Sequence, residues 1–402
     1  MRLLRQVTGY GFGFSIRCLH TDCNRSYRKT MSTILSDTHM AKIRALLIEL
    51  IDQENACEVV APNRRETGFW FGGGNPVMDA DGMLWVAGRF RNYGDSRTGL
   101  AAGERGLECA IFCSKDSGKT FDKVCSWSKA DLSFPENEVL SIEGTALHRK
   151  ADGTWELFIS SEKVRAYPEE VGSFLKPNCG VWSIDVISGR SPSELDADTI
   201  RCVLREDKQP AYIHIKDPVV FDNAAGETVM IFCNHPFCWS CSNSGYAVRA
   251  VGEEEFVLEE MEMVRRGATW DVACTRITDR MEIPRVGAFA DLPPASVFFY
   301  DGAECVRDHD ENAKAVSRPR GYSCEEIGSA FVGLDEQFPT MDRLSVLEPM
   351  FISPWGTGCN RYIHTCVTDA GIWVTWQRSE ADLSQPLVGN FLSMERIADL
   401  LS

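Results

Sequence analysis

The stretch Asp217-Pro218-Val219-Val220, which runs through a polar turn to Gly226 and on to Thr228-Val-Met-Ile-Phe232, carries the pattern that decides the fold. It begins with an acidic residue and a proline, continues with apolar residues, turns at a glycine and ends in a second apolar run. Two short β-prone runs joined by a tight turn are typical of a β-hairpin, because glycine supplies the backbone conformation that the turn needs. The stretch therefore predicts two neighbouring antiparallel strands.

The same pattern occurs three more times in the chain of 402 residues. The copies begin at Asn75, Glu143 and Glu348, close on Gly82, Gly153 and Gly358, and continue as Met83-Leu-Trp-Val-Ala, Thr154-Trp-Glu-Leu-Phe-Ile and Tyr362-Ile-His-Thr-Cys-Val. The four starts are about 68, 74 and 131 residues apart, so the last interval is close to twice the others. A degenerate copy is therefore expected between residues 270 and 305, where Asp271-Val-Ala-Cys-Thr-Arg-Ile-Thr and Val297-Phe-Phe-Tyr-Asp-Gly lie.

Repeats of this size that are built from strands predict an all-β fold, a β-propeller, with five blades favoured over six. Residues 39–402 are expected to form this single domain, which begins with a short helical extension, an amphipathic helix over residues 39–52 that could pack on the underside of the propeller. A short helix over residues 394–401 is expected to close the chain. Residues 1–38 are expected to be a disordered extension, or in part to precede a true start at Met31.

Composition narrows the class of protein. The formal charge of −16 argues against a nucleic-acid binder and against a protein of anionic membrane surfaces, because both need basic surface. No apolar run is long enough to span a membrane. The 16 cysteines include one C-x-x-C, Cys238 to Cys241, without a second pair at metal-binding spacing. We therefore expect a cytoplasmic protein without a metal or other cofactor.

One short motif has a defined turn geometry. Ser114-Lys-Asp116-Ser-Gly118-Lys-Thr120-Phe121 fits the Asp-box pattern Ser-x-Asp-x-Gly-x-Thr-aromatic at every fixed position. An Asp that accepts backbone N–H groups and a Gly at positive φ stabilise a hairpin turn of this kind. The motif supports the propeller and is not expected to be catalytic.

Together with the preceding run from Gly82 to Arg91, this motif resembles an early blade of the sialidases. The resemblance implies that Asp95 is the acid/base residue and that Arg89 or Arg91 lies near a site for the carboxylate of an acidic sugar. A sialidase-like site needs several convergent arginines, for which the candidates are Arg89, Arg91, Arg276, Arg320 and Arg361. The chain departs from the family in lacking a Phe-Arg-Ile-Pro segment.

The four-copy pattern also resembles the five-bladed glycosidases of the arabinanase, xylosidase and invertase type. In such propellers the first strand of each blade lines the axis, so acids at the blade starts converge on one pocket. The resemblance implies that Glu143 is the general acid and Asp217 the supporting acid. Asn75 stands where these families have a catalytic Asp, and an amide cannot act as a base or nucleophile. Another acid must then supply that role, or the propeller is a catalytically silent one that binds a glycan or a protein.

The chemistry of glycoside cleavage requires the same residue types. One carboxylic acid must protonate the leaving oxygen, and a second carboxylate must attack the sugar or activate a water. The predicted catalytic residues are Asp95, Glu143, Asp217 and Glu348. The leading function is a glycoside hydrolase that acts on a terminal sugar, with a sialidase-like hydrolase and a non-catalytic binding propeller as alternatives.

Residues that could bind the sugar flank these acids. The predicted substrate-binding residues are Arg89, Arg91, His214, Asn234, His235, Arg320, Glu325 and Arg361. Two of them, Arg320 and Glu325, lie in the polar stretch 307–328, which is too long for an ordinary connection inside a compact domain. Trp70 is one of several tryptophans that could stack on a sugar ring. His364 could hold an ion in the channel, although a buried core histidine is the simpler interpretation.

Overall fold

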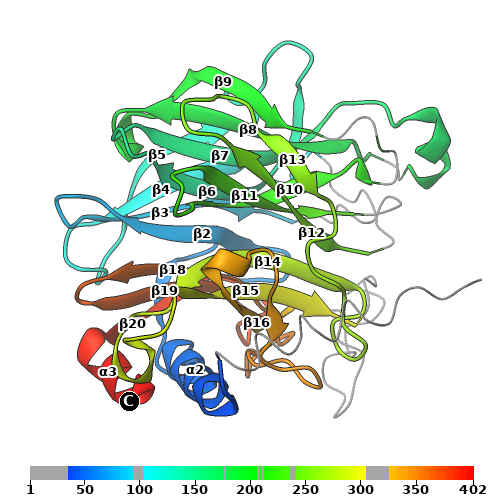
Figure 1. Ribbon diagram of the computed structural model, residues 1–402. Coiled ribbons are helices and arrows are strands. Elements are labelled where there is room, and N and C mark those ends of the chain that lie inside the picture. Colours follow the sequence, from blue (N-terminus) through cyan, green and yellow to red (C-terminus); the bar gives the residue numbers. More distant parts are fainter. Residues whose placement is uncertain are drawn as a thin grey trace, which may run out of the picture.

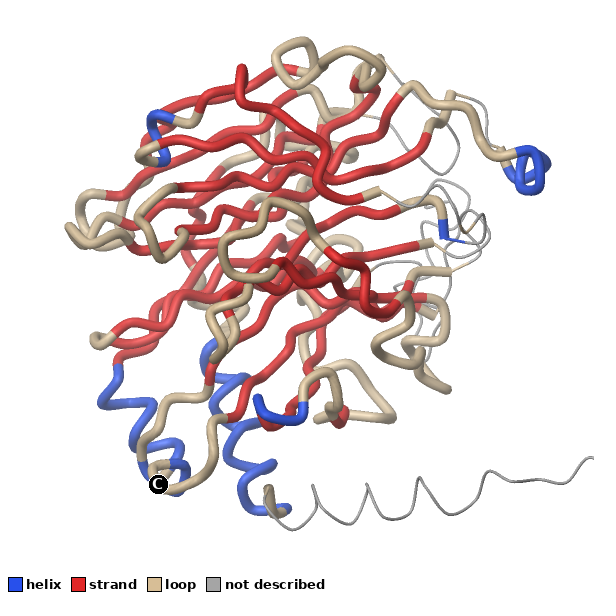
Figure 2. The backbone as a smooth tube through the Cα atoms, turned by 45° about the horizontal axis from the view of Figure 1, so that its top comes forward, coloured by secondary structure: helices blue, strands red, loops and turns tan. Residues whose placement is uncertain are grey.

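The computed structural model describes residues 35–93, 103–175, 178–205, 209, 212–235, 241–304 and 326–402. Within them the chain forms five four-stranded antiparallel sheets, each of which is one blade of a β-propeller (Figure 1). The prediction of five blades is therefore confirmed. Strands make up most of the body of the molecule, and the two α-helices lie together at one end of it (Figure 2).

The blades follow one another along the chain. Blade 1 contains β2 (Trp70–Met78), β3 (Leu84–Arg91), β4 (Glu108–Ser114) and β5 (Asp122–Ser128); blade 2 contains β6 (Val139–Arg149), β7 (Trp155–Lys163), β8 (Val181–Gly189) and β9 (Asp196–Leu204). Blade 3 contains β10 (Ile215–Asp222), β11 (Thr228–Asn234), β12 (Asn243–Arg249) and β13 (Val257–Glu260); blade 4 contains β14 (Cys274–Glu282), β15 (Ala295–Ala303), β16 (Ile327–Leu334) and β17 (Asp342–Arg343). Blade 5 contains β18 (Asn360–Thr368), β19 (Gly371–Arg378), β20 (Leu387–Ser393) and β1 (Cys57–Val60).

Blade 5 joins the two ends of the described chain. Its outermost strand is β1, which pairs with β20 from the other end. The first strand of each blade is innermost, and β2, β6, β10, β14 and β18 contact one another in a closed ring. Because these five strands surround the axis, side chains at corresponding positions in different blades can meet there.

One hydrophobic cluster fills each interface between neighbouring blades. Trp85, Ile111, Leu147 and Leu157, for example, belong to the cluster between blades 1 and 2. Similar clusters lie between blades 2 and 3, 3 and 4, 4 and 5, and 5 and 1. A blade thus buries its apolar faces against its two neighbours, which explains why the strands of the interior read as nearly continuous apolar runs.

The predicted hairpins at Asn75, Glu143 and Asp217 are β2–β3, β6–β7 and β10–β11. The degenerate copy expected between residues 270 and 305 is β14–β15.

The copy assigned to Glu348 is wrong. The inner strand of blade 5 is β18, the run that was expected to be its second strand, and residues 352–359 contain no strand. Phe351 makes only an isolated bridge to Gly328. The N–H groups of Met350 and Phe351 both donate to the carbonyl of Gly328 on β16, at 3.0 and 2.9 Å, so this segment is tied to blade 4 and does not start a hairpin of blade 5.

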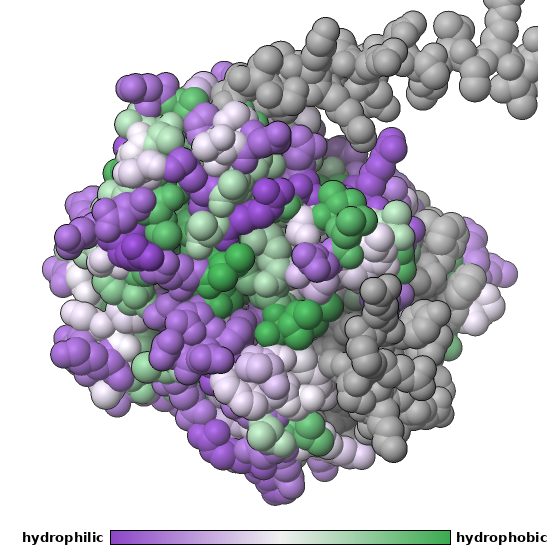
Figure 3. Space-filling model, turned by 90° about the horizontal axis from the view of Figure 1, so that it is seen from below, coloured by the Kyte–Doolittle hydropathy of each residue, from purple (hydrophilic) through white to green (hydrophobic). Residues whose placement is uncertain are grey.

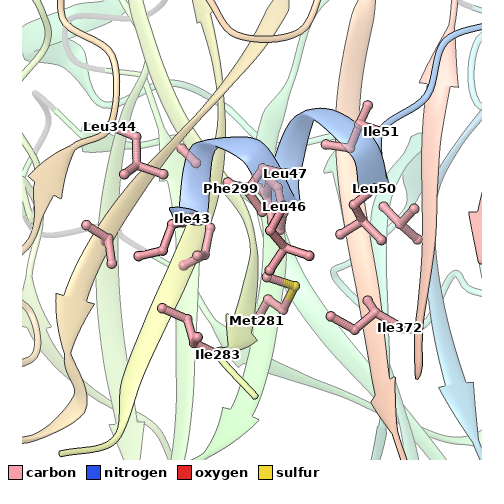
Figure 4. Close-up of a cluster of buried hydrophobic side chains, with 14 of the residues drawn as sticks. Ile43, Leu46, Leu47, Leu50, Ile51, Met281, Ile283, Phe299, Leu344 and Ile372 are labelled. Atoms are coloured by element: carbon pink, nitrogen blue, oxygen red, sulfur yellow. The ribbon is translucent and has the colours of Figure 1, made fainter. Parts of the chain in front are cut away.

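Helix α2 (Asp37–Leu50) covers blades 4 and 5, beside α3 (Met394–Leu401). Ser36 caps it by accepting a hydrogen bond from the backbone N–H of His39. Its apolar stripe of Ile43, Leu46, Leu47 and Leu50 is completely buried against Met281, Phe299 and Ile372 (Figure 4). Seen from below, the described surface is largely polar and its hydrophobic residues form small separate patches (Figure 3). In the described part of the chain no helix has the length and apolarity needed to cross a membrane.

The Asp-box forms the turn between β4 and β5. One Asp116 oxygen accepts hydrogen bonds from Ser114 Oγ and from the backbone N–H groups of Lys119 and Thr120, at 2.8–3.1 Å, and the other accepts Thr120 Oγ1 at 2.7 Å. The hydrogen bonds of Thr120 hold the pKa of Asp116 below its usual range. Gly118 has φ = +78°. These contacts are local, so the motif stabilises a blade turn away from the axis.

An ionic network joins blades 2 and 3 near the ends of β6 and β10. Arg249 donates two hydrogen bonds to Glu156, at 2.8 and 2.6 Å, and the buried His148 lies 3.5 Å from Glu156 and 3.3 Å from Asp222. Burial lowers the pKa of His148, but the hydrogen bonds with Asp222 and Glu156 raise it more, so its net direction is upward. The imidazolium therefore stabilises the contact between the two blades.

We expect this histidine to make stability depend on pH. Because its pKa is raised in the folded state, its contribution is complete below the unfolded value of about 6.5 and is lost as the pH rises through the folded pKa. At low pH wild type should exceed His148→Gln in unfolding free energy by about 1.5–3 kcal/mol, the range for hydrogen bonds to charged groups. Denaturant unfolding of both proteins from pH 5.5 to 9 measures this difference. A difference that stays constant over the range would contradict the assignment.

Candidate active site

Each inner strand carries a bulge, where its register against the second strand shifts, and β6 has a further shift between Val139 and Ser141. The shifts lie between Gly72 and Asn75, Ile142 and Thr145, Lys216 and Val219, Ile277 and Asp279, and Arg361 and His364. The bulges contain Gly73, Glu143, Asp217, Thr278 and Tyr362. Asp217 and Tyr362 have φ of +54° and +51°, a left-handed conformation that costs energy for residues other than glycine. Such strain is concentrated at functional sites, which makes this level of the axis the candidate site.

Hydrogen bonds from blade to blade fix the bulges. Ser160 Oγ on β7 donates to the carbonyl of Gly144 at 2.9 Å and accepts the backbone N–H of Asp217 at 3.1 Å. The N–H of Gly144 in turn donates to Asp217 Oδ1 at 3.1 Å. These bonds satisfy backbone groups that the bulges remove from the strand pairing. The positions of Glu143 and Asp217 are therefore coupled.

Glu143 is a buried carboxylate held by cations. Arg91 Nη1 lies 2.9 Å from Oε1 and Arg89 Nη2 lies 3.5 Å from Oε2, while Ser141 Oγ donates to Oε1 at 2.9 Å. Burial raises the pKa of Glu143, but Arg91, Arg89 and Lys216 lower it further, so the pKa lies well below the usual range. Glu143 is thus a permanent anion at neutral pH.

Tyr362 lies between the acids of blades 2 and 3. Its hydroxyl is 3.5 Å from Asp217 Oδ2 and 3.4 Å from Arg89 Nη2, the atom that also contacts Glu143. Three successive contacts of 3.4–3.5 Å thus connect Glu143 to Asp217. Two carboxylates this close are compatible with the separation of roughly 5 to 10 Å found in glycosidases.

Arg276 on β14 contacts Asp217 from blade 4. Its Nη1 lies 3.3 Å from Asp217 Oδ2, and its Nη2 lies 2.8 Å from Asp301 and 2.7 Å from Glu326. Its guanidinium also stacks on the ring of Tyr362, 4.4 Å from the centroid. Burial raises the pKa of Asp301 to about 6, although Arg276 opposes the shift. One side chain therefore neutralises acids from blades 3 and 4.

The rings of Trp70 and Tyr362 lie among the arginines of the axis. Arg361, which pairs with Glu326, lies over Trp70 at 3.7 Å from the ring centroid. Arg89 and Arg91 lie at 5.6 and 5.5 Å from the same ring. Cation–π contacts of this kind stabilise a guanidinium and fix its plane. Trp70, a predicted sugar platform, therefore stands inside the arginine cluster.

Positive charge predominates in this part of the axis. Among the described residues it contains five cations, Arg89, Arg91, Lys216, Arg276 and Arg361, and four carboxylates, Glu143, Asp217, Asp301 and Glu326. The whole chain, by contrast, has a formal charge of −16. Arg89 also keeps Nε and Nη1 buried and without a hydrogen-bond partner in the described structure. The cluster therefore has donors that an anionic or oxygen-rich ligand can use.

Asn75 has a different environment from the catalytic Asp that the resemblance places there. Its side-chain amide donates to the carbonyl of Leu147 at 2.9 Å and accepts the N–H of Leu147 at 2.9 Å. It therefore joins β2 to the inner strand of blade 2 in the way that a backbone amide would. The bulge of blade 1 contains Gly73, so the inner strand of blade 1 contributes no carboxylate at the level where the five bulges lie.

Asn75→Asp should consequently weaken the fold and add no activity. A carboxylate cannot donate to the Leu147 carbonyl, so one bond is replaced by a repulsion between two oxygens. We expect a loss of about 1–3 kcal/mol in unfolding free energy, the cost of an unsatisfied buried polar group. Denaturant unfolding and the turnover of the best substrate measure the two quantities. Higher turnover in Asn75→Asp would mean that this position does face the substrate.

The predicted binding residues of blade 3 form a separate layer next to the axis. His214 is buried, with its Nε2 3.0 Å from the Tyr167 hydroxyl, and His235 Nδ1 lies 3.1 Å from the carbonyl of Cys241. Burial and the nearby Lys216 hold the pKa of His235 well below its usual range, so it is neutral. Asn234 donates to the carbonyl of Met261 at 2.5 Å. These contacts hold the three side chains in place, and their role in substrate binding stays a prediction.

Some of the other predicted residues lie in the axial site, and others lie outside it or outside the described part of the chain. Arg89, Arg91, Arg361, Glu143 and Asp217 meet at the axis, as the contacts above show. Glu348 is exposed in the loop before β18, outside this site, and its catalytic role stays a prediction that the axial contacts do not support. Asp95, Arg320 and Glu325 lie outside the described residues, and their roles stay predictions.

Several residues of the axis were not predicted, namely Tyr362, Asp301, Glu326 and Lys216. Tyr362 and Asp217 share one signal, because each follows a basic residue at the bulge of an inner strand. Asp301 lies on the second strand of blade 4, and Glu326 lies just before its third strand. The sequence pattern covered only the starts of inner strands, so it did not include these two positions.

His364 is buried at the end of the bulge of blade 5, where its Nδ1 lies 3.9 Å from Asp279. Among the residues that the structure describes, no group of three or more His, Cys, Asp or Glu side chains could hold a metal ion. His364 is 4% exposed, and the ion-holding role considered from the sequence stays a prediction.

Comparison with solved structures identifies the same architecture in other proteins. The structure of BT0996 in an RGII complex superposes with a TM-score of 0.55 at 10% identity, covering 87% of this protein and 95% of the other. CoXyl43, a β-xylosidase/α-arabinofuranosidase from a compost microbial metagenome, gives 0.51 at 9% identity with coverage of 84% and 95%. A glycosyl hydrolase from Bacteroides ovatus gives 0.51 at 12% identity with coverage of 86% and 90%. Identities this low establish a shared fold alone.

No protein-family model matches the sequence, and no curated protein sequence matches it.

Proposed function

We propose that the protein is a glycoside hydrolase that removes a terminal sugar at the propeller axis. The observation that carries the proposal is the meeting of Glu143 and Asp217, carboxylates from two blades, within three contacts of each other. The names of two structural neighbours, a β-xylosidase/α-arabinofuranosidase and a glycosyl hydrolase, support the same reaction class.

The burial of the site supports attack on a chain end. Glu143 and Asp217 are only 3% and 5% exposed. A terminal sugar can enter an enclosed site and leave the rest of its chain outside, whereas an internal sugar would need an open groove on both sides. The proposed enzyme is therefore exo-acting.

Electrostatics assign different roles to the acids. Because Arg91 and Arg89 keep Glu143 ionised, it suits attack on the sugar or activation of a water, and it is a poor proton donor. This differs from the general-acid role that the family resemblance implies. We propose Glu143 as the anionic catalyst, Asp217 as the residue that positions the Tyr362 hydroxyl and Arg276, and Asp95 as the proton donor.

A second candidate substrate class is favoured by the arginines. Arg89, Arg276 and Arg361 surround Tyr362, and Arg89 retains two buried N–H groups without a described partner. A carboxylate on the sugar would satisfy such donors with charge-assisted hydrogen bonds. A sialidase-like hydrolase of acidic sugars is therefore the alternative to one that acts on neutral pentoses.

A panel of aryl glycosides decides between these substrates. It contains an α-arabinofuranoside, a β-xyloside, a β-glucuronide and a sialoside, assayed with wild type, Glu143→Gln and Asp217→Asn. Turnover of one member that is lost in both folded variants supports the hydrolase and identifies the sugar. If wild type turns over no member, the non-catalytic glycan-binding propeller becomes the better account.

The role of Asp95 has its own test. A general acid is needed most when the leaving group is poor, so Asp95→Asn should lose about 10²–10⁴-fold on a phenyl glycoside and little on a dinitrophenyl glycoside. Equal losses on both substrates would show that Asp95 does not protonate the leaving oxygen.

A further inference from the structure

A pocket lies on blade 1, beyond the start of β2 and the end of β3. It has a volume of about 940 Å³, near the upper end of the range of roughly 300–1,000 Å³ for ligand sites. It is lined by Asn63, Arg64, Glu66, Thr67, Phe69, Asn92, Tyr93, Glu104 and Leu107. None of these residues takes part in the contacts described above for the axial site.

The pocket directly follows the axial site along both strands. Phe69 immediately precedes Trp70, and Tyr93 comes two residues after Arg91. Trp70 and Arg91 are register partners on β2 and β3, and both belong to the arginine cluster around Glu143. A molecule whose end lies at the axis can therefore extend along blade 1 into this pocket.

The walls of the pocket are fixed before any ligand binds. The carbonyl of Phe69 accepts the N–H of Gln385 at 3.0 Å, and its N–H donates to the carbonyl of Glu66 at 3.3 Å. Gly68, with φ = +84°, lies against Tyr93, where a Cβ would be 3.3 Å from the ring. Asn63 donates to Asn92 at 3.0 Å across the pocket. These contacts fix the backbone of Phe69 and the place of Tyr93 beside Gly68.

The chemistry of the lining selects a sugar. Tyr93 is 43% exposed, so a large part of its ring is open to a ligand, and Phe69 is half-buried with Arg64 over its ring at 5.3 Å. Aromatic rings bind the C–H faces of sugars, and amides such as Asn63 and Asn92 both donate to and accept from hydroxyl groups. Arg64 pairs with Glu66 at 3.4 Å, and Glu104 adds a negative charge. With one positive and two negative side chains, the lining suits a neutral glycan and repels a polyanion.

We propose that this pocket, with Tyr93 and Phe69 as its aromatic platforms, binds the neutral sugar units that follow the terminal sugar of an oligosaccharide. This inference rests on the proposed function, because its kinetic test requires that the protein hydrolyse a glycoside. It adds that the substrate is a chain of at least two to three sugars, and that the part of the chain that is not cleaved off supplies binding energy along blade 1.

The test compares substrates of different length. Wild type, Tyr93→Ala, Phe69→Ala and Tyr93→Phe are assayed on the aryl monoglycoside that the panel identifies and on the corresponding oligosaccharides of two to five units. Tyr93→Ala and Phe69→Ala should each lower kcat/KM about tenfold on three or more units, mainly through KM, and leave the monoglycoside within twofold. Tyr93→Phe keeps the ring and should keep most of the affinity. Val124→Ala, an exposed residue of β5 elsewhere on blade 1, is the matched control.

A binding measurement makes the result independent of catalysis. Wild type, Tyr93→Ala and Glu143→Gln are applied to an array of neutral oligosaccharides that includes xylo- and arabino-oligosaccharides. Binding that Tyr93→Ala loses and Glu143→Gln keeps supports the pocket even when no substrate is hydrolysed. Equal losses of kcat/KM on mono- and oligosaccharides, no loss on either, or no binding of wild type to any neutral glycan would each overturn the proposal.

Discussion

Replacing Glu143 by Gln should abolish turnover and leave the propeller folded. The amide keeps the size and the hydrogen-bonding oxygen of the side chain but cannot carry the charge that Arg91 and Arg89 stabilise. Acid/base and nucleophilic groups contribute large factors to catalysis, so we expect kcat to fall by at least about 10³-fold. The loss should appear in kcat, because the carboxylate acts on the reacting carbon more than on the rest of the sugar.

Glu156→Gln is the matched control for this variant. Glu156 is likewise buried and paired with an arginine, Arg249, but it lies between blades 2 and 3 outside the axial cluster. It should lower the unfolding temperature and change kcat less than twofold. Glu143→Ala with azide adds chemical information, since azide can occupy the space of the missing carboxylate and attack the sugar. A folded Glu143→Gln enzyme with wild-type kcat would remove Glu143 from the mechanism.

The periodicity of the sequence predicts the fold well because every blade solves the same packing problem. Hairpins that turn on Gly82, Gly153 and Gly226 recur since each needs a positive φ at the turn, and these glycines have φ of 78–88°. The error at Glu348 shows the limit of this logic. A Glu-Pro pair followed by two apolar residues resembles a blade start, but the backbone N–H groups of Met350 and Phe351 donate to Gly328 of blade 4 instead of pairing within a hairpin of blade 5. The number of blades was nevertheless correct, because β18 lies only a few residues further on.

The inner strands made part of the candidate site predictable, and the resemblance to a sialidase blade added Arg89 and Arg91 on β3. Glu143 and Asp217 were found because acids at blade starts must converge around the axis. Whether such an acid is a proton donor depends on its partners, and Arg89, Arg91 and Lys216 come from two other blades. Asn75 illustrates the same point, since its bonds to Leu147 exist only once blades 1 and 2 meet. Sequence spacing thus locates the axis, whereas the charge state of its residues follows from three-dimensional contacts.

The axial cluster has a cost in stability. It holds nine charged groups, the five cations and four carboxylates named above, which are largely removed from water, and each charge is compensated by others within the cluster. Breaking such a network by removing one partner is expensive, because the remaining charges stay buried without compensation. The residue on which most of this compensation depends is Arg276, which contacts Asp217, Asp301 and Glu326.

Arg276→Met should therefore produce the largest loss of stability in the protein. The methionine fills part of the space but leaves three carboxylates facing one another, at a cost of about 3–5 kcal/mol in unfolding free energy at pH 7. The loss should shrink in acid. Burial already raises the pKa of Asp301 to about 6 in the folded protein, whereas its unfolded pKa is near 4. Protonation of Asp301 therefore favours the folded state, and the unfolding free energy increases as the pH falls from about 6 towards 4. Because Arg276 opposes this rise in the pKa of Asp301, removing the arginine should raise that pKa further and make the increase in unfolding free energy begin at a higher pH.

Denaturant unfolding of Arg276→Met and wild type between pH 4.5 and 8 tests this, with Arg280→Met as the control. Arg280 is on the same strand and pairs with a single acid, Asp335, at 2.7 Å. We expect a difference from wild type that narrows steeply below pH 6 for Arg276→Met and stays small and nearly constant for Arg280→Met. A pH-independent loss in Arg276→Met would mean that the arginine acts through its packing on Tyr362 and not through the three carboxylates, and the electrostatic account of the axis would then fail.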